Sequence, residues 1–367
     1  MSSVHPKLCQ FLLLTCWYIT ISSVERITED QDPHCEDSDK DDPSCIIEDV
    51  SHFPGHWPSS YCKVKNVAFH VGEKSLKVKK STILHLDQCF GIKDIWTFDL
   101  FKNKFMNKLD CDQVFERGYF VTMYYYHGSN YFHLHYDTVL PLYVALHCDS
   151  NNKELADEDI VILPAIELTR GQNIDWETKA FMDPKMYWMD VLQLVTSPHK
   201  ILPVDLRLRA VNKTICFKEA FFGTPQVKFS DPTIIRGYRD FIKKRLSIKE
   251  LDSGWIQPHV GIIHREGRRK ILNEKELMRS VDKFSDVELI DFSKMSFQEQ
   301  VNKVQDYDIL VGINGAGLTN ALYLPNHSVA IQLIPYKTFG LHYQELVGLI
   351  TMYVGYFVLR ILHEKGE

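Results

Sequence analysis

The sequence predicts an α/β protein built of two halves, the second of which contains a doubly wound parallel sheet. Short apolar runs with β-branched or aromatic residues alternate with stretches of helical periodicity in both halves. Two helical stretches of the second half begin with capping patterns, Asn273 with Glu276 and Ser296 with Glu299. A glycine-rich turn follows the apolar run 309–313, as at the strand-to-helix junctions of ligand-binding α/β folds.

The first half becomes globular near Tyr61. Its apolar runs predict strands, and its apolar residues at helical spacing predict helices, one of them with proline in the first turn. In chain order we expect a strand over 119–126, a helix over 131–146, a strand over 159–163 that ends at Pro164, a helix over 184–195 and extended segments over 200–204 and 214–222. This alternation indicates an α/β domain over residues 61–235.

In the second half, residues 236–367, strands and helices alternate strictly, which predicts parallel strands joined by crossover helices. We expect a connecting helix over 235–246, a strand over 259–264, a helix over 273–283, a strand over 287–292, a helix over 296–305, a strand over 308–312, a short helix to 324 and a strand over 329–334. The apolar stretch 346–359 is short for a membrane span, so it predicts a buried helix, turn and strand. Two α/β halves of this kind predict a ligand cleft between them.

The first 60 residues predict a route through the secretory pathway. Lys7 precedes an uncharged apolar run, so residues 1–24 are predicted to be a signal peptide or a type II signal anchor. Residues 25–60 are rich in Asp and Glu and predict a disordered acidic stem. The protein is therefore expected in the lumen of the endoplasmic reticulum or Golgi, membrane-anchored or secreted, with glycosylation expected at the sequons of Asn212 and Asn326.

Charge and cysteine content exclude some classes of protein. The net charge of −6 lacks the basic footprint of a nucleic-acid-binding protein. The 9 cysteines include no C-x-x-C pair, so neither a zinc ribbon nor a thioredoxin-like site is indicated. In an oxidising lumen some of these cysteines are expected to form disulfides, and their connectivity stays open.

Two features are expected at the carboxyl edge of the second sheet. Gly315 and Gly317 leave room for a ligand beside the helix that follows them, although a tight corner without a ligand is an equal alternative. The spacing matches neither the dinucleotide fingerprint nor a P-loop. Arg265 and Arg269 follow strand 259–264, so they are expected at the same edge, where arginines can bind a diphosphate; the alternative is a solvated basic loop.

The third feature is the segment H-L-H-Y-D on helix 131–146. His133 and Asp137 are four residues apart and share a helix face, where either can act as a general base or serve only in packing. His133 and His135 do not converge on a helix, so a metal pair is discounted. D-x-D triplets, which hold a divalent ion in some sugar transferases, occur at 37–39, 110–112 and 306–308 and carry little weight.

These motifs resemble glycosyltransferase family 61. Residues 311–325, V-G-I-N-G-A-G-L-T-N-A-L-Y-L-P, are similar to its signature V-G-x-H-G-A-G-L-T-x-x-L-F-L-P. Residues 265–277 are similar to its stretch R-x-x-x-R-x-I-L-N-E-x-E-L. Residues 130–142 are most similar to the branch of protein O-linked-mannose β-1,4-N-acetylglucosaminyltransferases, with the EGF domain-specific O-GlcNAc transferase branch as the alternative.

The resemblance implies a GT-B fold with two Rossmann-like domains facing a cleft, residues 61–235 on the acceptor side and 236–367 binding the nucleotide sugar. It implies inverting transfer of N-acetylglucosamine from UDP-GlcNAc to a protein-linked glycan or protein hydroxyl, without an essential metal. Arg265 and Arg269 are expected to hold the diphosphate, and His133 or Asp137 to lie near the acceptor. The residues expected to line the donor site are Asn314, Gly315, Ala316, Gly317 and Leu318.

One departure from the signature keeps a second function open. Asn314 stands where the family has histidine, and an asparagine neither carries a positive charge nor titrates near neutral pH. The alternative function is therefore a non-catalytic member that binds a nucleotide sugar or a glycoprotein. A metal-dependent GT-A enzyme using Asp110 and Asp112 is a remote third possibility.

Overall fold

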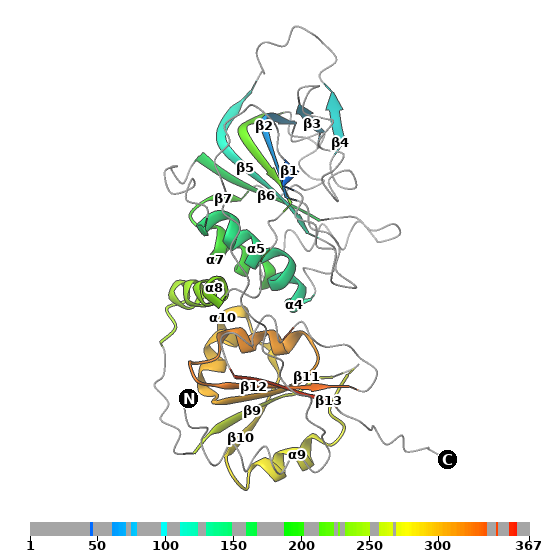
Figure 1. Cartoon of the computed structure of the whole chain (residues 1–367), viewed down its shortest axis with the longest axis vertical. Coiled ribbons are helices and arrows are strands. Elements are labelled where there is room, and N and C mark those ends of the chain that lie inside the picture. The colour runs from blue at the N-terminus through cyan, green and yellow to red at the C-terminus, as the bar shows by residue number, and fades with distance from the viewer. Residues whose placement is uncertain are drawn as a thin grey trace, which may run out of the picture. The chain divides into compact units, whose positions relative to one another are not determined.

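The structure is a computed structural model whose described residues form two compact units, one within 42–228 and one within 229–367 (Figure 1). It describes residues 45–46, 61–70, 75–78, 97–100, 111–123, 130–148, 159–166, 187–201, 213–223, 227, 232–249, 257–266, 269–335, 343 and 352–357. The predicted leader at 1–24 lies outside these residues, as does most of the predicted stem. No helix in the described ranges is long and apolar enough to cross a membrane.

The N-terminal unit is built on an eight-stranded sheet in the order β4-β3-β2-β8-β5-β6-β7, with β1 beside β2. Strands β8, β5, β6 and β7 are parallel, whereas β2 runs antiparallel to β1, β3 and β8. The strands are β1 (Cys45–Ile46), β2 (Tyr61–His70), β3 (Ser75–Val78), β4 (Thr97–Leu100), β5 (Gln113–Met123), β6 (Ile160–Ile166), β7 (Lys200–Ile201) and β8 (Thr214–Phe222).

This sheet is mixed, so the expectation of a doubly wound parallel sheet holds only for part of it. The connection from β2 to β3 spans residues 71–74, which is too short for the crossover that parallel neighbours require. Strand β6 also continues past Pro164, where a strand end was expected. Proline is tolerated there because β7 pairs only with Val161 and Ile162, so among the described strands one side of β6 is an open edge at Pro164.

The predicted helix over 131–146 is one continuous helical segment with two π-helical stretches. It consists of α4 (Tyr131–His133), η2 (Leu134–Val139), α5 (Leu140–Tyr143) and η3 (Val144–Cys148). Asn130 caps its start, since its Oδ1 accepts a hydrogen bond from the Phe132 N–H at 3.1 Å. Pro141 has no N–H to donate, and the neighbouring Leu140 N–H donates to the His135 carbonyl five residues back. Such π stretches are frequent at functional sites.

A disulfide and an aromatic cluster hold the N-terminal unit together. Cys111, just before β5, is bonded to Cys216 in β8, at a sequence separation of 105. Phe120 meets Phe217 edge to face at 5.4 Å and stacks on Phe222 at 4.6 Å. Helix α5 packs against α7 (Tyr187–Thr196) beside this sheet. The disulfide agrees with the expectation of an oxidising compartment.

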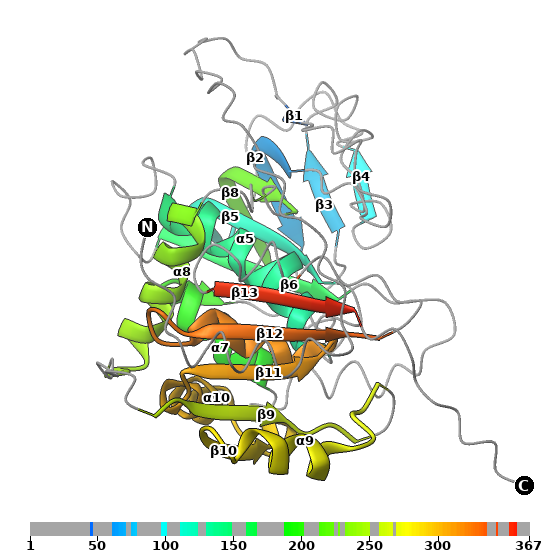
Figure 2. The same ribbon diagram turned by 60° about the horizontal axis from the view of Figure 1, so that its bottom comes forward.

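The C-terminal unit contains the predicted parallel sheet. Figure 2 shows its five strands side by side in the order β10-β9-β11-β12-β13, every neighbouring pair parallel. The strands are β9 (His259–Ile263), β10 (Asp286–Ile290), β11 (Ile309–Ile313), β12 (Val329–Ile334) and β13 (Met352–Phe357). Counted within the unit this is the order 2-1-3-4-5, one of the two common doubly wound arrangements.

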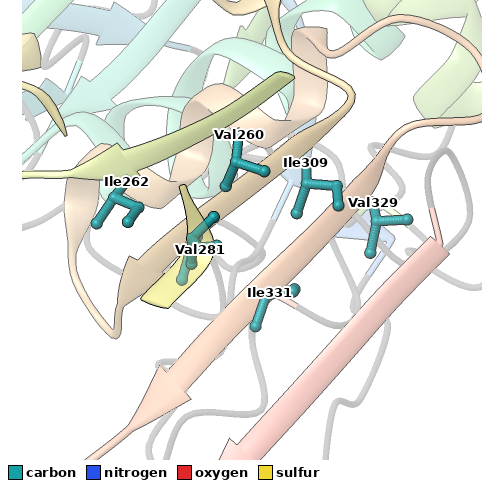
Figure 3. Packing of buried hydrophobic residues seen from close by; sticks show 7 residues of the cluster. Val260, Ile262, Val281, Ile309, Val329 and Ile331 are labelled. Carbon is teal, nitrogen blue, oxygen red and sulfur yellow. The ribbon is translucent and has the colours of Figure 1, made fainter. Parts of the chain in front are cut away.

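Helices cover both faces of the parallel sheet. Helix α9 (Glu274–Val281) lies on one face, where it closes a cluster of aliphatic side chains (Figure 3): Val260, Ile262, Val281, Ile309, Val311, Val329 and Ile331. Helix α10 (Phe297–Lys303) lies on the other face, flanked by the short helices η7 (Phe292–Lys294) and η8 (Val304–Asp306). The capping box of Ser296 and Glu299 is present at the start of α10, as predicted.

Two further helices complete this side of the unit. The segment after the glycine turn is the 3-10 helix η9 (Ala316–Tyr323), and the connecting helix is α8 (Pro232–Arg245). They pack together, and the Tyr323 hydroxyl donates to the Tyr238 hydroxyl at 3.3 Å. Tyr238 is fully buried, and burial raises the pKa of its phenol.

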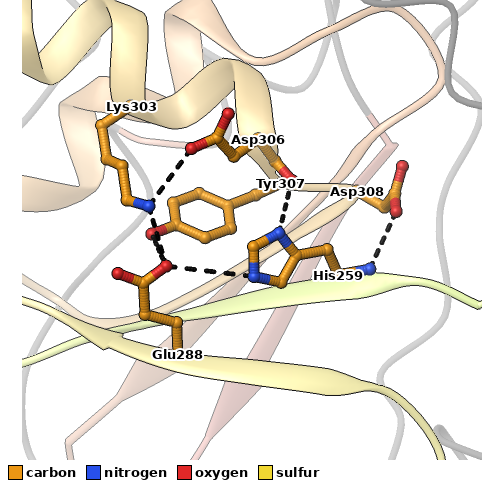
Figure 4. Close-up of polar contacts among 6 residues, drawn as sticks. All are labelled: His259, Glu288, Lys303, Asp306, Tyr307 and Asp308. Carbon is orange, nitrogen blue, oxygen red and sulfur yellow. Dashed lines mark hydrogen bonds and ion pairs between the residues drawn. The ribbon is translucent and has the colours of Figure 1, made fainter.

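The amino edge of the parallel sheet is joined by a polar network (Figure 4). Lys303 donates to Glu288 at 2.8 Å and to Asp306 at 3.2 Å, and the Tyr307 hydroxyl donates to Glu288 at 3.1 Å. Asp308 accepts from the N–H of His259 at 2.8 Å. Burial alone would raise the pKa of Glu288, but the hydrogen bonds from Lys303 and Tyr307 outweigh it and hold that pKa below its ordinary value.

We predict that Gly261→Ala destabilises the C-terminal unit by about 1 to 3 kcal/mol through overpacking. A Cβ at this position would lie 2.9 Å from the ring of Tyr307, which is fully buried beneath the network. The free energy of unfolding in denaturant is the measurement. The control is Leu272→Ala in the same unit, where the side chain is 69% exposed and the change should stay within about 0.5 kcal/mol. Equal effects of the two substitutions would contradict the prediction.

Candidate functional site

The strand order of the C-terminal unit identifies the position on its sheet at which doubly wound folds bind ligands. Strand β9 lies between β10 and β11, and the chain passes from β9 to β10 and then back across to β11. The helices after β9 and β10 therefore lie on opposite faces, which opens the carboxyl edge between β9 and β11. The residues that follow these two strands are His264 and Arg265 after β9, and Asn314 and Gly315 after β11.

Arg265 and Gly315 meet at this edge. A Cβ built on Gly315 would lie 1.8 Å from a terminal nitrogen of the Arg265 guanidinium, so only glycine lets the arginine lie on the turn. The other two glycines of the turn serve packing: a Cβ on Gly312 would meet Ile263 at 2.8 Å, and one on Gly317 would meet it at 3.3 Å. Gly315 is thus the position where the turn and the arginine depend on each other.

Arg265 and Arg269 give this edge positive charge. Burial, followed by the nearby charge of Arg269, lowers the pKa of Arg265, while Tyr343 acts in the opposite direction. Within the described part of the chain, neither arginine forms an ion pair with Asp or Glu. Arg269 has a backbone φ of 53°, which is uncommon for a residue with a side chain. Two adjacent arginines without acidic partners form a site suited to an anion.

The remaining predicted donor residues differ in their surroundings. Asn314 is buried, and its N–H donates to the Leu333 carbonyl at 2.9 Å, which extends the pairing of β11 with β12. Ala316 is half-buried at the start of η9. Leu318 is 1% exposed, and its N–H donates to the Gly315 carbonyl at 2.9 Å. The side chain of Leu318 is therefore a core residue, and its contribution to a site is confined to the backbone.

In the N-terminal unit, His133 and Asp137 form a close pair. The ring nitrogen Nδ1 of His133 lies 2.6 Å from Asp137 Oδ2, and the two side chains are 37% and 25% exposed. When Nδ1–H donates to the carboxylate, Nε2 is the basic nitrogen of the ring. The pair thus has the orientation of a histidine base held by a carboxylate. It sits at the start of the π-helical stretch η2.

His135 has a different role from its neighbour. Its ring is fully buried, and Nδ1 donates to the Tyr131 carbonyl at 2.9 Å. Burial lowers the pKa of His135 to about 4, although the hydrogen bond to Tyr131 acts in the opposite direction. His135 is therefore a neutral core residue at physiological pH. Of the two histidines in H-x-H, His133 is partly exposed and His135 is buried.

The one D-x-D triplet that the structure describes in full lies at the other edge of this sheet. The carboxylates of Asp306 and Asp308 are bonded to Lys303 and to the His259 N–H, at the amino edge of the sheet. Asp112 accepts from the Thr214 N–H at 2.7 Å, while Asp110 and the triplet at 37–39 lie outside the described residues.

The two predicted sequons also differ in what the structure describes. Asn326 is exposed on the turn before β12, and its Oδ1 accepts from Arg239 at 3.1 Å. Asn212 lies outside the described residues.

Sequence reasoning missed Tyr343. This tyrosine is 5% exposed and lies close enough to Arg265 to act on its charge. It comes from the segment between β12 and β13, which carries no recognisable motif. The one signal that could have indicated it is its aromatic side chain in a segment to which no element was assigned.

Comparison with known proteins connects these features to a family. The profile described as Glycosyltransferase 61 matches residues 127–331. The EGF domain-specific O-linked N-acetylglucosamine transferase of Gallus gallus is 28% identical over 242 residues, which cover 61% of this chain and 41% of the relative. The protein of the same name from Xenopus laevis is 26% identical over 259 residues, covering 65% and 45%, and that from Drosophila melanogaster 26% over 256 residues, covering 65% and 45%.

The chain thus spans less than half the length of these curated relatives, which bear the name of the second of the two predicted branches. The matched region includes the pair of His133 and Asp137, both arginines and the glycine turn. Because the profile covers more than half of the chain and all of these features, the chain belongs to glycosyltransferase family 61.

Proposed function

We propose that this protein is an inverting glycosyltransferase that moves N-acetylglucosamine from UDP-GlcNAc to a protein hydroxyl or a protein-linked O-mannose. The observation that carries the proposal is the contact of Arg265 with Gly315 beside Arg269, two cations without a carboxylate partner among the described residues. The similarity to EGF domain-specific O-linked N-acetylglucosamine transferases supports N-acetylglucosamine as the sugar. The disulfide between Cys111 and Cys216 supports a lumenal compartment, the endoplasmic reticulum or Golgi.

In this proposal the C-terminal unit holds the donor. Arg265 and Arg269 bind the diphosphate of the UDP-sugar, and the backbone of the turn at Gly315 lies against it. As the bond from the anomeric carbon to the β-phosphate oxygen breaks, its electron pair leaves with UDP, and the fixed arginines stabilise that charge. Two cations in place before the reaction supply what a divalent metal supplies in other transferases, so no essential metal is proposed.

The N-terminal unit supplies the base. Nε2 of His133, oriented by Asp137 through Nδ1–H, takes the proton of the acceptor hydroxyl, and the acceptor oxygen attacks the anomeric carbon opposite the departing UDP. One displacement from that side inverts the configuration. The proposal includes a GT-B arrangement, in which the acceptor pair and the donor site face one cleft.

A second function is favoured by Asn314 alone. The family signature has histidine here, whereas this chain has a buried asparagine at the carboxyl end of β11. A protein that binds a nucleotide sugar or glycoprotein without turnover would retain the arginines and lose the histidine.

We predict that Arg265→Ala or Arg269→Ala weakens UDP binding by about 2 kcal/mol, roughly 30-fold in Kd, because each removes a charged hydrogen bond to the diphosphate. Isothermal titration with UDP measures it. The matched control is Arg279→Ala, an exposed arginine of α9 whose Nε donates to the Lys275 carbonyl.

Gly315→Ala should weaken UDP binding in the wild-type background and add little to Arg265→Ala, because the new Cβ acts by displacing that arginine. Wild-type affinity in all three variants would remove the basis of the proposed function.

We predict that His133→Gln lowers kcat by roughly 100-fold or more while leaving the Kd for the UDP-sugar unchanged, since the base acts on the acceptor alone. Asp137→Asn should lower kcat less, because it disturbs only the orientation of the ring. Transfer to an acceptor peptide and donor binding are measured on the same preparations. Full activity in His133→Gln would exclude this histidine as the base.

We predict that wild-type protein transfers sugar measurably and that Asn314→His raises kcat, because histidine can donate a charged hydrogen bond to the leaving phosphate. Transfer and UDP affinity are compared in the two proteins. UDP binding without transfer by either protein would favour the non-catalytic function instead.

A further inference from the structure

A second histidine–carboxylate pair lies at the carboxyl end of β9. Nδ1 of His264 lies 2.8 Å from Oε2 of Glu274, the first residue of α9. His264 directly precedes Arg265, and ten residues separate it from Glu274 along the chain. Neither residue belongs to the donor set expected from the sequence, and no sequence pattern links the two.

The ring of His264 is fixed on the α9 side of the sheet edge. The backbone N–H of His264 donates to the Ile290 carbonyl at 2.8 Å, which continues the pairing of β9 with β10. Val260 and Ile262 face the aliphatic cluster beneath α9, and alternation along the strand puts His264 on that same face. Arg265 falls on the opposite face, where it meets Gly315. Together they flank the end of β9 from both sides.

Glu274 is the more buried member of the pair. Its side chain is 14% exposed, whereas that of His264 is 31% exposed. Its Oε1 is buried and has no hydrogen-bond partner within the described ranges. A buried carboxylate with so few partners favours a positive charge beside it, and His264 is the titratable group in contact. The carboxylate also accepts the hydrogen bond of Nδ1–H, which leaves Nε2, on the far side of the ring from Glu274, as the nitrogen available to a ligand.

We propose that His264 is a third cationic residue of the donor site, oriented by Glu274, and that it binds the diphosphate of the nucleotide sugar. This inference rests on the proposed function and deepens it. The signature histidine is replaced by Asn314 directly after β11, and His264, directly after the adjacent strand β9, supplies a donor instead. Because an imidazole changes charge between about pH 5 and pH 8, donor affinity becomes pH-dependent, rising as the pH falls.

The other charged groups around His264 do not reproduce this dependence. Arg265 and Glu266 follow His264 along the chain, and Glu274 faces it from α9. Asp291 and Lys294 follow the neighbouring strand β10. Hydrogen bonds from Ser293 and then Lys294 lower the pKa of Asp291 to about 2, so its carboxylate stays ionised above about pH 5.

The test is the affinity for UDP-GlcNAc, measured by isothermal titration from about pH 5.5 to about pH 8.5. The diphosphate of this probe has no ionisable proton in that range, so a change in affinity reports on the protein. Wild-type protein should bind roughly tenfold or more tightly at the acidic end, the worth of a charged hydrogen bond. His264→Gln should bind like wild type at the basic end and show no gain on acidification. Glu274→Gln should reduce the gain, because the ring loses the charged acceptor that orients it.

The matched control is His259→Gln, at the opposite end of the same strand, which should keep the wild-type pH profile. Thermal unfolding at each pH verifies that every variant is folded, and the wild-type profile stands even where a variant is not. A pH-independent affinity in wild type, or an unchanged profile in His264→Gln, would overturn the inference while leaving the proposed function intact. No binding of UDP-GlcNAc or other UDP-sugars at any pH would overturn the proposed function itself.

Discussion

The contact between the Arg265 guanidinium and the backbone of Gly315 is the constraint on which the candidate site depends. It joins the carboxyl ends of β9 and β11, two strands paired in parallel register at the place where the strand order reverses. No side chain fits at residue 315 while the arginine holds this position. The glycine turn and the basic segment are therefore one feature of the fold, brought together by the pairing of β9 with β11.

The charged side chains at the two edges of the parallel sheet differ in their partners. At the amino edge, Lys303 is shared by Glu288 and Asp306, and Tyr307 completes the network, so each charge has a partner. At the carboxyl edge, Arg265 and Arg269 lie close enough to repel each other. Keeping like charges together at a partly buried edge costs folding free energy that a bound anion recovers. This contrast points to a stabilising role for the first edge and a binding role for the second.

Both units contain a partly exposed histidine whose Nδ1 lies against a carboxylate, His133 with Asp137 and His264 with Glu274. In both pairs the carboxylate is the less exposed member and accepts from Nδ1, so it sets the tautomer of the ring. The same device serves different chemistry according to its surroundings. In the proposed function His133 acts as a base on the acceptor hydroxyl, and in the further inference His264 acts as a cation beside the diphosphate.

Local patterns in the sequence determined much of the C-terminal unit. Strict alternation predicted the parallel strands β9 to β12, the spacing of Ser296 and Glu299 predicted the start of α10, and parallel strands necessarily bring Arg265 and the glycine turn to one edge. These follow from residues near one another in the chain, or from a rule that holds for any parallel sheet. In the N-terminal unit the same approach predicted a helix over 131–146, which the structure extends to Cys148, and the shared face of His133 and Asp137.

Only the tertiary structure decided which strands are neighbours. The strand order 2-1-3-4-5, the antiparallel pairing of β2 with β8 and the bond between Cys111 and Cys216 each depend on contacts between segments that are distant in sequence. The same holds for the position of Pro164, which depends on how far β7 pairs along β6. The fit of Arg265 to Gly315 and the pairing of His264 with Glu274 arise in the same way. Periodicity reports which face of an element is buried, but not which partner buries it, because the partner is selected by packing between elements.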